Sequence, residues 1–333
     1  MIRRPPRSTH CISSAASDVY KRQVEMSRKH LRVGMLACVL IWVIFGGGLS
    51  GKSSTTGFPI TITDNQGRKV TIHRQPRRII SLSPANTEIL FSLGLDEEIV
   101  GVTEFCNYPS KAQAKEKIGG YSNPNLEKIV SLKPDLILAD YGNPIKGITQ
   151  IEGLGYTVVG LNSKTIEDVL ENINLVGKIT GKDKEASELI ANMKERLNSI
   201  ARKINNLTED ARPKVLYVIW YPPLWTAGSG TFIDELITRA GGINVASDVS
   251  GYTQMSLETV VEKNPQVIVV GESKDQPGLI KVVREESAFS EMDAFRNGRI
   301  YTMDTDILSR PGPRIVDALE KLVKLLHPEM FKE

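Results

Sequence analysis

Cysteine and histidine are scarce in this 333-residue sequence, and their scarcity excludes several kinds of site. Two of the three cysteines, Cys11 and Cys38, lie near the N-terminus, which leaves Cys106 as the one thiol beyond residue 57. A single thiol builds neither a disulfide framework nor a thiolate metal centre. Of the four histidines only His73 and His327 follow residue 57, far from any metal-ligand spacing. We therefore expect no metal site and no resident cofactor.

Enzymatic motifs are also missing. The sequence has no nucleophile elbow and no Walker loop. A small-residue turn enters a predicted helix at residues 228–236 (GSGTFIDEL), where a helix N-terminus could receive an anionic group. A plain helix start explains the same residues. We therefore expect a protein that is not an enzyme.

Positive charge is not in excess over most of the chain, although the formal net charge is +3. Residues 1–57 contain nine Lys and Arg against two Asp and Glu. The remainder has 42 − 9 = 33 basic and 39 − 2 = 37 acidic residues, a net charge of −4. Charge therefore gives no support to a nucleic-acid partner.

The N-terminal residues divide into two segments. Residues 1–25 match nothing that follows and resemble a translated sequencing adapter, so we exclude them from the fold and expect the natural start at Met26. Residues 26–57 have the pattern of an export signal: a basic start, an apolar run from Val33 to Phe45, and a polar linker. The run is long for a signal peptide and short for a free-standing membrane span.

The segment Leu49–Lys52 resembles a lipoprotein box in which lysine replaces the lipidated cysteine. We expect the body of the protein to be exported, to the periplasm or to the outer face of the cytoplasmic membrane. It would be either cleaved free near Ser50 or held at the membrane by an uncleaved N-terminal helix. The sequence leaves these two outcomes open.

One stretch of the sequence is repeated. Residues 125–139 (NLEKIVSLKPDLILA) align with residues 256–270 (SLETVVEKNPQVIVV) at an offset of 258 − 127 = 131. In each copy a helix-capping residue precedes Leu and Glu, a proline ends the helix, and a β-branched run follows. An offset this long predicts two similar lobes, since solenoid repeats recur every ~20–50 residues. Similar helix–strand units that occur in any α/β protein are the alternative explanation. The identical pairs are Leu126/Leu257, Glu127/Glu258, Val130/Val261, Pro134/Pro265 and Ile137/Ile268.

Strands and helices alternate on both sides of the repeat, which predicts parallel or mixed sheets covered on both faces. We predict an α/β fold of two Rossmann-like lobes, residues 58–165 and 213–333, each with a central sheet flanked by helices. Residues 166–212 would supply two connecting helices, the first from about Ile166 to Thr180. The second, from about Asp183 to Asn205, would reach roughly 35 Å and join the lobes as a single long helix. An ordinary surface helix would have the same periodicity.

Aromatic residues make up only 6% of the sequence, and several of them fall in predicted loops. The relevant loops are residues 103–123, 220–230, 244–255 and 304–313. Crevices of α/β sheets open at the carboxyl ends of strands, and large apolar ligands need aromatic walls. Arg310, in the turn SRPGPR, could meet an anionic or amide group of a ligand, or cap the preceding helix. The loop aromatics are Phe105, Tyr108, Tyr121, Trp220, Tyr221, Trp225 and Tyr252.

Together these features resemble a known family. RRIISLSPANTEILFSLG, the two copies of the repeat, the long central helix, GTFIDELITRAGGIN and SRPGPR follow one another over residues 58–327. This order is similar to that of the helical-backbone (class III) solute-binding proteins. The resemblance implies a monomeric receptor that delivers its ligand to an ABC permease dimer with its ATPase. It also implies that Glu127 and Glu258 dock onto arginines of the permease, a role compatible with stabilising a helix start.

The family contains receptors for cobalamin, iron–siderophores and haem, and the SLSPANTE and NLE stretches favour the cobalamin branch. Histidine-ligated metal receptors of the wider superfamily have ligands that this chain lacks. Asp140 departs from the cobalamin pattern, since an aromatic residue is expected after that strand. The ligand-binding residues that we predict are Phe105, Tyr121, Trp220, Trp225, Tyr252 and Arg310.

Other interpretations stay open. A ferric siderophore or haem would make Arg310 a natural anion contact. A two-lobe α/β enzyme would hold an acid or base with a shifted pKa in the same cleft, with Asp140, Glu104 and Asp304 as the candidates. A membrane-tethered sensor would require that the N-terminal helix stays uncleaved.

Overall fold

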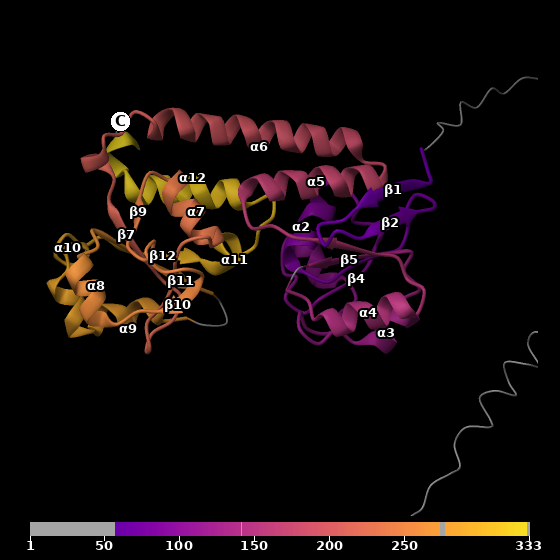
Figure 1. The fold of residues 1–333 in the computed structure, drawn as a ribbon, viewed down its shortest axis with the longest axis horizontal. Coiled ribbons are helices and arrows are strands. Elements are labelled where there is room, and N and C mark those ends of the chain that lie inside the picture. Colours follow the sequence, from indigo (N-terminus) through magenta and orange to yellow (C-terminus); the bar gives the residue numbers. More distant parts are fainter. Residues whose placement is uncertain (1–56, 141, 274–276, 332–333) are drawn as a thin grey trace, which may run out of the picture. The chain divides into compact units, whose positions relative to one another are not determined.

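The computed structural model describes residues 57–140, 142–273 and 277–331, which belong to one compact unit (Figure 1). The expectations for residues 1–56, namely the adapter-like segment, the export signal and the lipoprotein box, lie outside the described residues. Among the helices that the structure describes, none is long and apolar enough to cross a bilayer.

The N-terminal lobe is built on a four-stranded parallel sheet with the strand order β4-β3-β5-β6. A hairpin, β1 paired antiparallel with β2, precedes this sheet. Helix α2 begins after Ser83, whose side chain accepts a hydrogen bond from a backbone N–H of the first turn. The elements of this lobe are β1 (Ile60–Thr63), β2 (Lys69–Ile72), β3 (Ile79–Ser81), α2 (Pro84–Ser92), β4 (Ile99–Val102), α3 (Leu126–Ser131), β5 (Leu136–Asp140), α4 (Ile145–Gly153) and β6 (Val158–Leu161).

The C-terminal lobe has a second four-stranded parallel sheet, with the order β12-β11-β7-β9. From β9 to β12, the strands across this sheet are its second, first, third and fourth in chain order. The strands of the first sheet, from β4 to β6, follow the same order, so both lobes share one topology. The elements are β7 (Lys214–Val218), β8 (Trp225–Ala227), α7 (Phe232–Arg239), β9 (Ile243–Asn244), β10 (Tyr252–Gln254), α8 (Leu257–Lys263), β11 (Val267–Glu272), α9 (Leu279–Glu285), α10 (Asp293–Arg296), β12 (Ile300–Asp304), α11 (Thr305–Leu308) and α12 (Ile315–Leu326).

The sequence repeat corresponds to the same local structure in both lobes, α3 followed by β5 and α8 followed by β11. The side chains of Asn125 and Ser256 each accept a hydrogen bond from the backbone N–H three residues later, which caps the two helices. Lys133 and Asn264, also 131 residues apart, both have a positive φ, 47° and 44°. The repeat therefore describes two equivalent units, as the sequence predicted.

Two long helices connect the lobes. Helices α5 (Ile166–Thr180) and α6 (Asp183–Ile204) match the predicted boundaries within one residue, and Gly181 between them has φ 69°. Figure 1 shows α6 running along both lobes above α5. With 22 residues, α6 is about 33 Å long. Arg196 on α6 forms ion pairs with Asp317 and Glu320 on α12, which fixes the helix to the C-terminal lobe.

One face of each sheet contributes to a shared central core. This core joins α2 and α5 in the first lobe to α7 and α12 in the second, with α6 covering it. The outer faces of the sheets pack separately, against α3 and α4 in the N-terminal lobe and against α8, α9 and α10 in the C-terminal lobe. Because the central core is continuous, the lobes cannot move far apart without exposing apolar surface to water.

Three segments that we predicted as loops contain short regular elements. Strands β8 and β10 pair with each other within residues 220–230 and 244–255, and α11 lies within residues 304–313. These elements have only three or four residues, too few to produce a hydrophobic period. The hydrogen bonds of β8 and β10 come from partners that are distant in sequence, whereas α11 is held by local bonds such as that from the Ser309 N–H to the Thr305 carbonyl.

The contact between α5 and α6 generates a stability prediction. A Cβ added at Gly177 would lie 2.4 Å from the Cβ of Ala186 on the neighbouring helix. We expect Gly177→Ala to lower the free energy of unfolding by about 1–3 kcal/mol, because the helices must separate to accept the methyl group. Denaturant unfolding would measure the change.

Gly153 provides the matched control, since it also lies in a helix but has no atom within 4 Å of an added Cβ. Gly153→Ala should raise the free energy of unfolding by about 0.5 kcal/mol through helix propensity. Equal effects at both positions would contradict the close helix packing.

Candidate functional site

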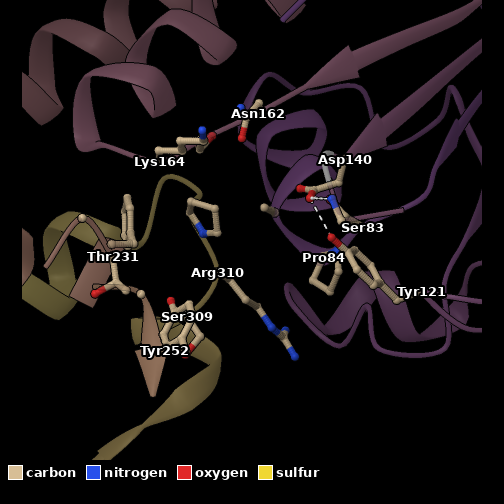
Figure 2. Close-up of a pocket in the computed structure, with 17 residues that line it drawn as sticks. Ser83, Pro84, Tyr121, Asp140, Asn162, Lys164, Thr231, Tyr252, Ser309 and Arg310 are labelled. Carbon is tan, nitrogen blue, oxygen red and sulfur yellow. Dashed lines mark hydrogen bonds between the residues drawn. The ribbon is translucent and has the colours of Figure 1, made fainter. Parts of the chain in front are cut away.

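A cavity of about 550 Å³ lies between the two lobes, and we call it the inter-lobe cleft (Figure 2). On the N-terminal side it is lined by residues that follow β3, β5 and β6, at the carboxyl ends of parallel strands. On the C-terminal side it is lined by the start of α7, by β10 and by the segment after α11. The residues used below are Ser83, Tyr121, Asp140, Lys164, Thr231, Tyr252, Ser309 and Arg310.

A second cavity of about 490 Å³ adjoins the cleft on the C-terminal lobe, and we call it the aromatic pocket. It shares Tyr252 and Ser309 with the cleft and is walled by Tyr217, Trp220 and Trp225. Burial raises the pKa of Tyr217 and of Tyr252, so both phenols stay neutral at physiological pH. The two cavities together offer a large space with an apolar end and a polar end.

Tyr121 and Asp140 form a hydrogen-bonded pair on the wall of the cleft. The Tyr121 hydroxyl donates to Asp140 Oδ1 over 2.6 Å, and the backbone N–H of Gly142 donates to the same oxygen over 3.1 Å. Burial, followed by the charge and hydrogen bond of Asp140, raises the pKa of Tyr121, which keeps the phenol a donor. A Cβ at position 142 would lie 2.2 Å from the Tyr121 hydroxyl oxygen, so glycine is needed there.

Arg310 lies at the cleft but is already paired. Its Nη2 contacts Asp306 Oδ1 at 2.5 Å, and its Nη1 donates to Asn107 Oδ1 over 2.6 Å. Asn107 in turn donates to Asp306 Oδ2 over 2.7 Å. From the sequence, Arg310 could be a ligand contact or a helix cap. In the structure it connects the C-terminal lobe to a loop of the N-terminal lobe, and the carboxylate of Asp306 compensates its charge.

Sequence reasoning missed an ion pair between the lobes. Glu88 on α2 accepts two hydrogen bonds from Arg314, over 2.9 and 2.5 Å, and is only 2% exposed. The Arg314 guanidinium also lies 3.9 Å from the ring centroid of Tyr108. In the sequence, Glu88 and Arg314 each resemble an ordinary surface charge, and no local pattern indicates that they pair. We call Glu88, Asn107, Asp306, Arg310 and Arg314 the inter-lobe latch.

Burial raises the pKa of the Glu88 carboxyl, and the hydrogen bonds and charge of Arg314 oppose that rise. Burial by itself lowers the pKa of Arg314, but its bonds to Glu88 turn the net shift upward. The pair is ionised, because a guanidinium keeps its proton at any accessible pH and both carboxylate oxygens accept hydrogen bonds from it.

The remaining predicted site residues lie outside both cavities. Phe105 is 52% exposed and lies beside Gly120, so its contact with a ligand stays a prediction. Glu127 and Glu258 are exposed in the first turns of α3 and α8, and neither carboxylate forms a hydrogen bond or ion pair with the residues that the structure describes. Their equivalent positions on the two lobes follow from the repeat.

The candidates for an enzyme site do not come together. Of Asp140, Glu104 and Asp304, only Asp140 lines the cleft. Asp304 caps α11 by accepting a hydrogen bond from the backbone N–H of Asp306. Among the described residues, no group of three or more His, Cys, Asp or Glu is arranged to hold a metal ion.

Known proteins resemble this chain in sequence. A family described as periplasmic binding protein matches residues 79–307. An uncharacterized ABC transporter substrate-binding lipoprotein of Bacillus subtilis is 34% identical over 316 residues, covering 91% of this chain and 99% of its own length. A cobalamin-binding protein of Halobacterium salinarum is 32% identical over 278 residues, 81% of this chain and 74% of its own length.

Solved structures resemble it in fold. The periplasmic vitamin B12 binding protein of Vibrio cholerae matches with a TM-score of 0.67 at 28% identity, over 77% of this chain and 99% of that one. A periplasmic haem-binding protein of Roseiflexus matches with a TM-score of 0.68 at 27% identity, over 76% and 98%. The predicted fold of two α/β lobes is confirmed.

The inter-lobe latch generates a prediction that a double-mutant cycle can check. Glu88→Gln should lower the free energy of unfolding by about 3–5 kcal/mol, because it leaves the buried guanidinium without a counter-charge. Combined with Arg314→Met, it should cost less than the sum of the single changes, with a coupling of about 1–3 kcal/mol. Urea unfolding at neutral pH would measure all three variants.

The control is Glu188→Gln, which removes an exposed ion pair with Lys184 at 3.7 Å. This change should lower the free energy of unfolding by less than about 1 kcal/mol, since exposed ion pairs contribute little to stability. Additive losses in the Glu88 and Arg314 cycle would show that the two side chains do not stabilise each other.

Proposed function

This chain belongs to the periplasmic binding protein family, and we propose that it captures a corrinoid, cobalamin or a close relative, outside the cytoplasmic membrane and delivers it to an ABC permease. Members of this family are substrate-binding proteins of ABC transporters rather than enzymes. The ligand, its site and its partner are the proposed part. The protein would act as a monomer and draw no energy from nucleotide itself.

The observation that carries the proposal is the two-chambered cavity between and beside the lobes. Its aromatic pocket suits a large apolar ring system, and its cleft presents hydrogen-bonding groups without a free guanidinium. A corrin has this character, since a large macrocycle carries neutral amide side chains. The sequence relative described as cobalamin-binding supports the same choice.

A ferric siderophore or haem is the second candidate, and the haem-binding structural neighbour favours it. Haem and ferric catecholates carry negative charge, for which Arg310 was the natural contact. The pairing of Arg310 with Asp306 weakens this candidate, because a ligand anion would have to compete with a carboxylate at 2.5 Å.

Delivery to the permease would use Glu127 and Glu258. Each lies at the start of a helix that precedes a parallel strand, and such helices run antiparallel to their strands. Their first turns therefore point toward the sheet edge at which the cleft opens. Exposed carboxylates without a protein partner on both lobes are suited to two matching cationic groups of a symmetric permease. The predicted export signal would place this surface outside the cytoplasmic membrane.

Ligand titration tests the proposed substrate. Purified protein is titrated with cyanocobalamin, a ferric hydroxamate, a ferric catecholate and haemin, and tryptophan fluorescence is corrected for ligand absorbance. We expect saturable one-to-one quenching by cyanocobalamin, because Trp220 and Trp225 wall the aromatic pocket. Tight binding of a siderophore or haemin alone would overturn the corrinoid assignment and keep the family.

Tyr252 is shared by both cavities, so Tyr252→Ala should weaken cyanocobalamin binding about tenfold or more. Phe105 lines neither cavity, so Phe105→Ala should weaken cyanocobalamin binding less, as measured in the same titration. An effect of Phe105→Ala as large as that of Tyr252→Ala would mean that the ligand extends past the cleft.

Charge reversal tests the docking surface. Glu127→Lys and Glu258→Lys should leave cyanocobalamin affinity unchanged and abolish uptake through the cognate permease, since both carboxylates lie outside the cavities. Uptake in reconstituted vesicles is the measurement. Glu195→Lys, an exposed change on α6, serves as the control and should transport normally. Loss of ligand binding in the docking variants would contradict the assignment.

A further inference from the structure

Asp140 presents one unused carboxylate oxygen to the inter-lobe cleft. Its Oδ1 accepts from both the Tyr121 hydroxyl and the Gly142 backbone N–H. Within the part of the chain that the structure describes, Oδ2 forms no hydrogen bond or ion pair. Figure 2 shows the Asp140 carboxylate on the cleft wall, with dashed lines from one oxygen to its hydrogen-bond donors and none from the other oxygen.

Three hydrogen bonds hold Asp140, two on its carboxylate and one on its backbone N–H. Tyr121 and Gly142 hold Oδ1, and the backbone N–H of Asp140 donates to Asn143 Oδ1 over 2.6 Å. Asn143 is itself buried and donates to the backbone oxygen of Leu82 over 3.1 Å. An acceptor oriented in this way before the ligand arrives requires little reorganisation on binding.

The charge of Asp140 is not offset by Arg310 across the cleft. Arg310 is paired with Asp306 and bonded to Asn107, as part of the inter-lobe latch. A ligand group that reaches Asp140 therefore meets a carboxylate oxygen that has no hydrogen-bond donor among the described residues. An N–H or O–H group gains a charge-assisted hydrogen bond there, whereas a carboxylate meets like charge.

We propose that Asp140 is a specificity-determining residue, which selects neutral ligands bearing amide or hydroxyl donors and rejects chelates that place a carboxylate at this wall. Tyr121 is its positioning residue. The inference rests on the proposed function, because it assigns a recognition role within the same cleft. It also accounts for the aspartate at a position where the family resemblance led us to expect an aromatic side chain.

The test uses an isosteric change and ligands that differ by one group. In Asp140→Asn, the amide oxygen can still accept from Tyr121 and Gly142, so only the atom facing the cleft changes. The probes are cyanocobalamin and its monocarboxylates, in each of which one peripheral propionamide is hydrolysed to a carboxylate. Haemin, which carries two carboxylates, completes the set. Dissociation constants are measured on the full protein by fluorescence quenching at low salt.

We expect the wild type to bind cyanocobalamin at least about tenfold more tightly than one of the monocarboxylates, the isomer that faces Asp140. Asp140→Asn should abolish that preference and strengthen haemin binding, since the new amide donates to a carboxylate. Tyr121→Phe should reduce the preference for cyanocobalamin over that monocarboxylate by a smaller factor, because the Asp140 carboxylate loses one of its two hydrogen-bond donors. A merely structural role for Tyr121 would weaken all ligands alike and leave the ratio unchanged.

Glu195→Gln is the charge-matched control. It should leave the ratios between the dissociation constants of the probes at their wild-type values. A ratio that is the same in the wild type and in Asp140→Asn would overturn the inference while leaving corrinoid binding intact. Wild-type protein that prefers a monocarboxylate or haemin would overturn it as well. Absence of binding to every probe by the wild type would overturn the proposed function, and the inference with it.

Discussion

The buried ion pair between Glu88 and Arg314 is the constraint on which the geometry of the cleft depends. A guanidinium and a carboxylate that are withdrawn from water must stay together, because separating them leaves an uncompensated charge in a low-dielectric interior. Their hydrogen bonds therefore hold α2 of one lobe against the start of α12 in the other. The SRPGPR turn provides both Arg310 and Arg314, so one rigid segment carries the contacts to the N-terminal lobe and part of the cleft wall.

This constraint acts together with the helices and the shared core. Helix α6 packs on α5 and is fixed to α12 by Arg196, while the apolar faces of both sheets meet in one continuous core beneath it. A wide opening of the cleft would break the ion pair and expose apolar surface at the same time. A ligand that binds in this cavity, as we propose, would find it already formed, which lowers the entropy cost of binding.

Charged residues have a structural role on one side of the cleft and, by our proposal, a recognition role on the other. The two arginines of the SRPGPR turn, Arg310 and Arg314, form ion pairs in the inter-lobe latch. Asp140, in contrast, has one carboxylate oxygen that faces the cavity. An aromatic pocket beside this polar wall would supply apolar contacts to a ligand. Such a combination suits a bulky ring with neutral polar substituents better than a small anion. The exposed glutamates of the repeat stay outside this network, so the proposed docking surface is separate from the proposed ligand site.

The sequence by itself determined the elements whose causes are local. The caps at Asn125 and Ser256, the boundaries of α5 and the equivalence of the two lobes follow from capping chemistry, hydrophobic period and the repeat. These signals act over a few residues, so they can be read without knowing the fold. The aromatic residues Trp220 and Trp225 were also placed at strand ends for this reason.

Only the tertiary structure decided which distant residues meet. Glu88 and Arg314 are 226 residues apart, and Asn107 and Arg310 are 203 apart, so nothing in either neighbourhood identifies the partner. The pairing of β8 with β10 and the absence of Phe105 from both cavities were hidden in the same way. Partner identity depends on how two parallel sheets are brought together by α5 and α6. That arrangement makes Arg310 part of the inter-lobe latch, and its contact with a ligand stays a prediction.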